Sequence, residues 1–449
     1  MAAMRMRNAG GARRFAAAVV LFLLFALFPG AARAAESDAY IVSALVSLAS
    51  YSDETGLLVR RWLKETNWTL RSSSAELGKT EGRVHLATKT LQDGRKALFL
   101  AFPGTENRKD LAVDLRLSLV PFGGTNPEEF AAFAAAADQA EDVPRVHKGF
   151  NDFTMAALFS ERLEAHGGRT TGEMLADELK EHPEETLYLT GHSLGGAAAL
   201  LTAARLADLG VPAEQLHVIT FGAPAVGDER FARLYENRLH LTRIVMTDDP
   251  VAGILQSVTR HFVQFGDKIV WQRASKEDRF GHELALYFDE ALRRYYNAEK
   301  ATEDVHDFLR GEPQEVEGGV YVAPSVFTLP KELAADAPYI DRAVHDSLAI
   351  RCRPLVFAAD DAPKDRAALL AEARAAGCRY LLMERFEVKF LRKEYNSYRL
   401  TLEEAVYASD GTLRSLSSRS TNTRRLPAIE GFLYLAYKGS EERDKALGL

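Results

Sequence analysis

The sequence predicts an α/β fold in the first two thirds of the chain and a smaller α+β region after it. Thr186–Thr190 forms an apolar, strand-like run, and an Ala/Leu-rich, helix-like run reaches Leu209. The chain has 449 residues, of which 47% are hydrophobic, so two or three domains with a substantial core are expected. After Arg310 the composition changes from strongly acidic to nearly balanced, which indicates a second domain.

A G-x-S-x-G motif lies between that strand and that helix, at residues 191–195. A serine on so sharp a strand-to-helix turn needs small neighbours, which Gly191, Gly195 and Gly196 provide. The turn would expose the Ser193 hydroxyl, and the helix start would place N–H groups beside a developing oxyanion. A chance Gly-Ser turn is the alternative for the bare motif, but the flanking strand and helix favour a nucleophile elbow.

The first 34 residues have the pattern of a secretory signal peptide. Four Arg residues precede the apolar run Phe15–Phe28, which is too short for an ordinary transmembrane helix. Ala32-Arg33-Ala34 fits the A-x-A cleavage pattern, so the mature chain is expected to start at Ala35 in a secreted or periplasmic protein. An uncleaved N-terminal anchor is the competing interpretation.

Charge and cysteine content exclude several classes of protein. The formal net charge of −7 becomes −12 without residues 1–34, which carry five Arg and no Asp, Glu or Lys. Such a balance disfavours nucleic acid as a partner. The only cysteines, Cys352 and Cys378, can form a disulfide or remain buried thiols, and they make a zinc site improbable. No metal or cofactor is expected.

Residues before the elbow predict further elements. Ser37–Lys64 has a helical pattern, and Val84–Thr90 and Lys96–Phe102 are expected to pair as strands. The second strand leads into Pro103-Gly104-Thr105, where an oxyanion hole can be built. Asn107–Val120 then alternates leucine and valine with polar residues, which fits an amphipathic surface helix or a movable lid.

Several motifs in order resemble the class 3 lipases, the fungal-lipase-like α/β-hydrolases, from about residue 40 to 300. They are F-P-G-T at Phe102–Thr105, V-H-K-G-F at Val146–Phe150, T-G-H-S-L-G-G-A at Thr190–Ala197, F-G-A-P-A-V-G at Phe221–Gly227, D-P-V at Asp249–Val251 and D-R-F-G-H-E-L-A-L-Y-F at Asp278–Phe288. The resemblance implies an α/β-hydrolase fold with a mostly parallel central sheet, and hydrolysis of acyl esters.

A catalytic triad follows from the chemistry and the resemblance together. A serine nucleophile needs a base, and the base needs an orienting carboxylate, in the chain order Ser, Asp, His. Asp249 matches the family's acid and His282 its base, so Ser193, Asp249 and His282 are the predicted triad. The backbone N–H groups of Leu194 and Thr105 would form the oxyanion hole.

Some positions have alternatives. Asp248 is the alternative acid, with a role in the turn otherwise. His261 begins an apparent strand, His306 lies in a charged helix, and His345 lies beyond the matched region. His147 and His192 are expected to pack or to hydrogen-bond. Pro103 stands where the family more often has Arg, which affects the expected geometry around Thr105.

The C-terminal region is predicted as a small accessory domain. Residues 35–311 form the hydrolase-like domain, residues 312–319 a linker, and residues 320–449 an α+β module with twenty basic and eighteen acidic groups. The module distantly resembles accessory domains of bacterial envelope lipoproteins, which implies binding of an envelope partner; a stabilising extension is the alternative.

Two functions follow from these features. The first is a secreted serine esterase that hydrolyses lipid esters, acylglycerols or phospholipids, in transient contact with a membrane or lipid surface. The second is a catalytically idle hydrolase-fold protein whose C-terminal domain binds an envelope partner. The complete set Ser193, Asp249 and His282 favours the enzyme, because a scaffold has no need of all three.

Overall fold

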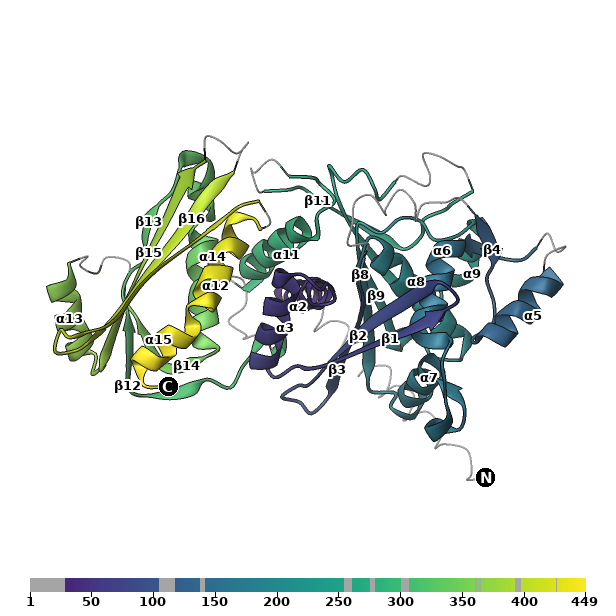
Figure 1. The fold of residues 1–449 in the computed structure, drawn as a ribbon, viewed down its shortest axis with the longest axis horizontal. Helices are drawn as coiled ribbons and strands as arrows, with labels where there is room; N and C mark the ends of the chain where they lie inside the picture. The colour runs from purple at the N-terminus through teal and green to yellow at the C-terminus, as the bar shows by residue number, and fades with distance from the viewer. Residues whose placement is uncertain are drawn as a thin grey trace, which may run out of the picture.

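The chain forms two layered halves joined through a set of helices between them (Figure 1). In the computed structural model, the described residues are 29–104, 118–137, 142–253, 261–274, 279–299, 307–359, 362, 365–391, 397–424 and 426–449. The N-terminal half is an α/β domain, and the C-terminal half is an α+β domain with its own sheet. Within the described residues, no helix is both long and apolar enough to span a membrane.

A seven-stranded sheet organises the N-terminal domain, in the order β1-β2-β3-β8-β9-β10-β11. The first two pairs are antiparallel, and the pairs from β3 to β11 are parallel. The carboxyl ends of the parallel strands therefore meet at one edge of the sheet, where sites form in such folds. The strands are β1 (Thr69–Leu77), β2 (Thr80–Thr90), β3 (Lys96–Phe102), β8 (Thr186–His192), β9 (Leu216–Phe221), β10 (His240–Met246) and β11 (Asp267–Trp271).

Helices cover both faces of this sheet. On one face, α2 and α11 pack against Phe99, Phe221 and Trp271. On the other, α8 and its neighbours pack against Leu98, Leu189 and other apolar strand residues. The helices are α2 (Pro29–Ala49), α3 (Glu54–Glu65), α5 (Pro127–Ala137), α6 (Lys148–Thr154), α7 (Thr171–Glu181), α8 (Leu194–Asp208), α9 (Glu229–Tyr235) and α11 (Leu284–Glu299). Short elements are β4 (Leu119–Pro121), β5 (Arg145–His147), β6 (Arg162–Leu163), β7 (Arg169–Thr170), a π-helical turn (Met155–Phe159) and single turns at Glu164–His166, Ala213–Gln215 and Asp307–Leu309.

The C-terminal domain is a second sheet in the order β14-β12-β15-β16-β17, with β13 paired to β15. Helices α12 and α14 cover one face, where Phe386, Leu400 and Leu402 join the same hydrophobic cluster as α2 and α11. Helix α13 covers part of the other face. The elements are β12 (Gln314–Val322), β13 (Val326–Thr328), a 3-10 helix (Lys331–Asp336), α12 (Ala337–Ala349), β14 (Cys352–Phe357), α13 (Arg366–Ala375), β15 (Tyr380–Phe390), β16 (Tyr398–Ala408), β17 (Leu413–Asn422), α14 (Ala428–Lys438) and α15 (Ser440–Leu447).

Two regions differ from the sequence prediction. The helical pattern of Ser37–Lys64 forms two helices, because Asp53 caps α3 by accepting a hydrogen bond from the Gly56 N–H at 2.8 Å. The segment 312–319, expected as a linker, lies largely in β12, which begins at Gln314. Its two glycines, Gly318 and Gly319, have positive φ and shift the pairing register, so they form an irregularity within a strand.

Other expectations lie partly or wholly outside the described residues. These are the segment to residue 28, Thr105, residues 107–117 of the expected lid, and His306. The two cysteines are free thiols in the C-terminal domain, and both are buried. Burial raises the pKa of the Cys352 thiol to about 11, so this group is a neutral core residue rather than a reactive thiolate.

A buried ion-pair network in the C-terminal domain leads to a stability prediction. Arg443 donates to Glu404 at 2.6 Å, and both residues are nearly fully buried. Glu404 is paired across β15 and β16 with Glu384, a second buried carboxylate. Arg419 also contacts Glu404, at 2.8 Å, and His345 contacts Glu384, at 3.1 Å, but both are more exposed than Arg443. Arg443→Met should therefore lower the free energy of unfolding by about 3 kcal/mol, because it removes the most deeply buried partner of these carboxylates. Urea denaturation measures this.

The matched control for Arg443→Met is Arg385→Met on the same sheet. Arg385 forms an exposed ion pair with Glu403 at 3.9 Å. Its loss should cost less than about 1 kcal/mol. Equal effects of the two substitutions would contradict a special role for the buried pair.

Candidate active site

Ser193 occupies a strained turn between β8 and α8. Its backbone has φ 57° and ψ −124°, so it is one of only two non-glycine residues with positive φ in the described part of the chain. The Ser193 N–H donates to the Phe221 carbonyl of β9 at 3.0 Å, and its own carbonyl accepts from Gly196 N–H at 3.0 Å. The neighbouring strand and the first turn of α8 thus hold the serine in a conformation that L-residues disfavour.

The glycines of the motif allow close backbone contacts around this serine. A Cβ atom on Gly191 would lie 2.3 Å from the carbonyl carbon of Gly195, and one on Gly195 would lie 2.1 Å from the Phe102 carbonyl oxygen. Both distances are shorter than real Cβ contacts. The second also shows that the end of β3 lies directly against the elbow. Any other residue at these two positions would displace the turn.

Asp249 and His282 form a buried acid–base pair beside the elbow. The Nδ1 atom of His282 lies 2.8 Å and 3.0 Å from the two Asp249 carboxylate oxygens, and the Asp249 side chain is 0% exposed. The Tyr287 hydroxyl also donates to this carboxylate, as does the Val251 N–H at 2.8 Å. Burial acts to raise the pKa of Asp249, but the bonds from His282, Tyr287 and Val251 hold the pKa below its usual value. The carboxylate is therefore ionised and orients the His282 ring.

Gly222 connects the elbow to this pair. It follows Phe221, whose carbonyl accepts the Ser193 N–H, and it has φ 58°. A Cβ atom there would lie 2.5 Å from Asp249 Oδ2 and 3.1 Å from His282 Nδ1. The other ring nitrogen of His282, Nε2, is buried and has no hydrogen-bond partner among the described residues. With Nδ1 bonded to Asp249, Nε2 is the nitrogen that can accept a proton.

His192 links the histidine loop to the segment between α2 and α3. Its Nε2–H donates to the His282 carbonyl at 2.7 Å, and its Nδ1 accepts from the Tyr51 hydroxyl at 3.0 Å. The rings of His192 and His282 lie 4.4 Å apart. Burial, and then the nearby His282, lower the pKa of His192 to about 3, so the ring stays neutral and keeps this donor–acceptor pattern. His192 is therefore a positioning residue for the His282 backbone.

The remaining candidates lie elsewhere. Asp248 forms an ion pair with Arg273 at 3.5 Å and does not contact His282. His261 is exposed, and His345 bonds to Glu384 in the C-terminal domain at 3.1 Å. His147 caps α6 by accepting from the Phe150 N–H. Leu194 is the first residue of α8, where N–H groups lack intrahelical partners, as the oxyanion role requires.

Three residues contribute to the site without having been predicted from the sequence: Tyr51, Gly222 and Tyr287. Gly222 and Tyr287 lie inside motifs that were recognised, F-G-A-P and H-E-L-A-L-Y, but nothing in those motifs predicts a contact with a carboxylate from another loop. Tyr51 lies 141 residues before His192, its partner. Only the fold brings these groups together.

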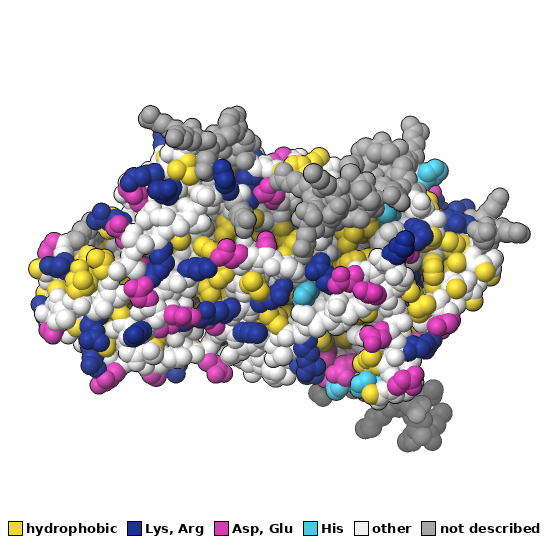
Figure 2. All heavy atoms as spheres, in the orientation of Figure 1, with side chains coloured by type: hydrophobic (Ala, Val, Ile, Leu, Met, Phe, Trp, Pro, Cys, Tyr) yellow, Lys and Arg dark blue, Asp and Glu magenta, His cyan; other side chains and the backbone are white. Residues whose placement is uncertain are grey.

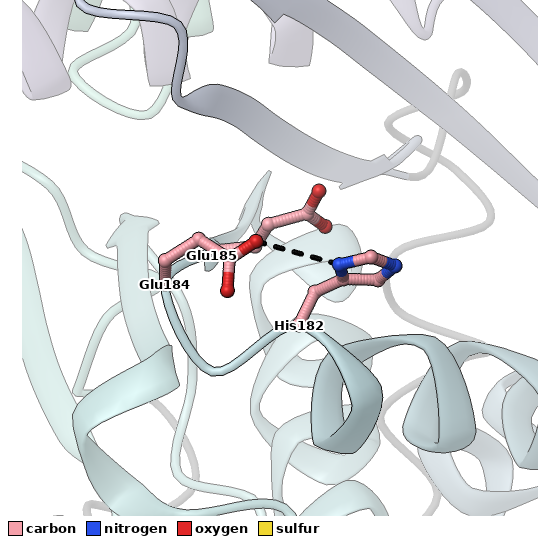
Figure 3. A group of neighbouring side chains, drawn as sticks. All are labelled: His182, Glu184 and Glu185. Atoms are coloured by element: carbon pink, nitrogen blue, oxygen red, sulfur yellow. Dashed lines mark hydrogen bonds and ion pairs between the residues drawn. The ribbon is translucent and has the colours of Figure 1, made fainter.

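A separate acidic group lies on the turn between α7 and β8. Figure 3 shows His182, Glu184 and Glu185 gathered there, with a contact of 3.4 Å between His182 Nδ1 and Glu184. Lys96 lies 3.0 Å from the buried carboxylate of Glu185. The Lys96 ammonium therefore already neutralises this carboxylate, and the three residues form part of an ion-pair network.

The sheet order, the strained serine between a strand and a helix, and the later acid and histidine loops define an α/β-hydrolase. Residues 99–258 match the family model of the class 3 lipases. This region of the N-terminal domain therefore belongs to the class 3 lipase family of the α/β-hydrolase superfamily.

Individual relatives share parts of this domain. A lipase of Rhizomucor miehei is 30% identical over 148 residues, which cover 31% of this chain and 32% of that protein. Phospholipase A1-IIbeta of Arabidopsis thaliana is 28% identical over 207 residues, 42% of this chain and 44% of that protein. Toxin TseL of Vibrio cholerae is 35% identical over 99 residues, 22% of this chain and 13% of that protein. The chain thus spans less than half the length of each of these curated relatives.

Solved lipase structures also align with the domain. A crystal structure of the lipase from Rhizopus microsporus var. chinensis has 20% identity and a TM-score of 0.39, with 56% of this chain and 77% of that chain covered. The native propeptide complex of the Rhizomucor miehei lipase has 22% identity and a TM-score of 0.37, with 52% and 67% covered.

Gly222→Ala tests the contact between the elbow and the Asp–His pair. The new methyl group would clash with Asp249 Oδ2, so it should separate the pair from Ser193. We expect labelling of Ser193 by a serine-directed phosphonate to slow by roughly 100-fold, the cost of a small misplacement. Gly210→Ala is the matched control, because Gly210 has φ +88° and no atom within 4 Å of an added Cβ. Equal labelling rates in the two variants would contradict this geometry.

The depressed pKa of His192 predicts loss of stability in acid. The folded protein holds His192 neutral down to about pH 3, whereas the unfolded chain protonates it near 6.5. Its stabilising contribution is therefore complete above pH 6.5 and declines as the pH falls toward 3. In urea denaturation between pH 6.5 and 4.5, His192→Gln should give a shallower pH dependence than the parent. Replacement of the exposed His166 by Gln should leave the slope unchanged.

Proposed function

We propose that the protein is a serine esterase that hydrolyses carboxylic ester bonds of lipids, with Ser193, His282 and Asp249 as its catalytic triad. The observation that carries the proposal is the buried His282 ring, bonded through Nδ1 to Asp249 and with no partner for Nε2 among the described residues. The ring lies 4.4 Å from that of His192, which directly precedes the serine on the strained turn. This arrangement prepares one nitrogen to take the serine proton.

The reaction proceeds in two steps. His282 Nε2 accepts the proton of the Ser193 hydroxyl as its oxygen attacks the ester carbonyl, and the same proton then passes to the leaving alcohol. The product of this step is an acyl ester on Ser193. A water molecule, deprotonated by His282, attacks that ester, and the acid leaves as the proton returns to Ser193. Asp249 stays ionised and stabilises the imidazolium in both steps.

The oxyanion formed in each step is assigned to two backbone donors. Leu194 N–H lies at the positive end of α8, directly after the nucleophile. The second proposed donor is the N–H of Thr105, which lies outside the described residues. The residue before it, Gly104, lies against the elbow, since a Cβ there would be 2.7 Å from the His192 carbonyl oxygen. Removal of one such donor typically costs 10²–10³-fold in rate.

The substrate class is proposed from the family. Relatives in it are named as lipases and as phospholipases A1, so the ester is that of an acylglycerol or a phospholipid. With the signal peptide of residues 1–34 removed, the enzyme acts outside the cytoplasm, in transient contact with a lipid surface. Binding of an envelope partner by the C-terminal domain remains a prediction from the sequence.

Substitutions in the triad test the proposal. Ser193→Ala and His282→Ala should each abolish ester hydrolysis with folding intact, because triad members act as a unit. Asp249→Asn should lower kcat by about 10⁴-fold. The measurement is turnover across a panel of esters that varies acyl length and head group, with Ser193→Ala as the blank.

The control is His261→Ala, which changes an exposed histidine after the same acid loop and should retain activity. Activity in the Ser193→Ala variant would contradict the assignment of Ser193 as the nucleophile. Absence of turnover of every ester by the parent, with Ser193 unreactive to phosphonates, would favour the catalytically idle alternative.

A further inference from the structure

A cavity of about 360 Å³ lies at the boundary between the two domains. Its walls come from α2, α3 and α11 of the hydrolase domain and from α12 and α14 of the C-terminal domain, with residues 309–313 between them. These five helices occupy the middle of the molecule in Figure 1. Ser193, Asp249 and His282 do not line this cavity. It is therefore a space separate from the catalytic residues.

The lining is mostly alkyl and aromatic. Four helices contribute large apolar side chains to it: Leu45 of α2, Leu58 and Trp62 of α3, Leu292 of α11 and Leu433 of α14. Its volume falls in the range of small-molecule sites, which are mostly apolar with a few polar groups at defined places. A water-filled space with such walls is unfavourable, and an empty one forfeits dispersion contacts. Both arguments favour an apolar occupant.

Hydrogen bonds between the two domains brace this space. The hydroxyls of Tyr434 and Tyr437 on α14 bond to Glu54 and Glu65 on α3, at 2.5 Å and 3.2 Å. The two tyrosines also line the cavity, so their polar ends are engaged with α3 while their rings contribute to the wall. These hydrogen bonds fix the positions of α3 and α14 on two sides of the cavity, so the site is formed before a ligand binds.

The charged groups of the lining decide the kind of ligand. Arg310 is the one cation of the lining, and Asp346 and Glu430 are two carboxylates. The lining therefore has no excess of positive charge for a free carboxylate or a phosphate, whose burial without a cation is costly. It accommodates an uncharged head with hydroxyl or ester oxygens.

We propose that this cavity binds one acyl chain of a neutral lipid, of the monoacylglycerol class, at a site separate from Ser193. The choice of an acyl ligand rests on the proposed esterase function, whereas the site itself rests on the cavity. Figure 2 shows hydrophobic side chains at the surface in the middle of the molecule, between the domains, where such a chain can enter. The ligand would contact both domains and so stabilise their association.

Quenching of Trp62 fluorescence tests the site. The chain has three tryptophans, and Trp68 and Trp271 are only 2% and 1% exposed. In the full-length Ser193→Ala protein, which cannot hydrolyse the ligand, a monoacylglycerol brominated on its acyl chain should quench saturably, below its solubility limit. The same lipid without bromine gives the baseline. The quenching should disappear in Trp62→Phe.

A filling substitution and its control locate the ligand. Ala349 is exposed and lines the cavity, so Ala349→Trp should fill the space and weaken binding at least tenfold. Because this variant adds a tryptophan, its binding is measured by competition for a neutral solvatochromic dye. Ala375→Trp, at the exposed last residue of α13 in the same domain, should bind like the parent. Thermal unfolding checks that both variants fold.

The outcomes are separable. Absence of saturable quenching, quenching that persists in Trp62→Phe, or equal binding by the Ala349 and Ala375 variants would overturn the cavity proposal. Stronger competition by a free fatty acid than by the monoacylglycerol would overturn the uncharged head group. Since binding is measured in a protein without its nucleophile, failure of the esterase proposal would appear only in the parent's turnover.

Discussion

The backbone of Ser193 is the constraint on which the N-terminal domain depends. Its conformation costs of the order of 1–3 kcal/mol and persists only where the surroundings fix it. Three adjoining strands do so: β8 carries the serine, β9 accepts its N–H through Phe221, and β3 ends with the Phe102 carbonyl against Gly195. Parallel pairing of these strands brings their carboxyl ends to the same edge of the sheet. A shift in the register of the strands would therefore also change the geometry of the site.

Helices α2 and α11 have a double role in this arrangement. One side of each contacts the catalytic region: Ser47 of α2 hydrogen-bonds Thr190 of β8 at 3.2 Å, and Tyr287 of α11 bonds Asp249. The next residue of each helix, Leu48 and Phe288, lines the cavity between the domains. Neighbouring residues on a helix point about 100° apart, so one helix can serve two surfaces. The C-terminal domain therefore packs on the same helices that support the acid and the nucleophile strand.

The sequence predicted the parts of this structure that local patterns determine. The elbow and the strands β2 and β3 follow from glycine spacing and from runs of apolar residues. The nearness of Asp249 to His282 was predicted through a family resemblance, since 33 residues separate them. Tyr51 and Gly222 could not be predicted, because their contacts depend on how the loops meet at the sheet edge.

The cleavage site expected from the sequence can be compared with the position of helix α2. The expected cleavage after Ala34 falls inside α2, which the structure describes from Pro29 to Ala49. Three α2 residues line the cavity, Ile41, Leu45 and Leu48, and all of them follow that position. So does Ser47, which bonds to β8. Loss of the first 34 residues would shorten the helix at its start and leave these contacts in place. The predicted secretion signal and the observed packing of α2 are therefore compatible, since the half of α2 that supports the site lies beyond the cut.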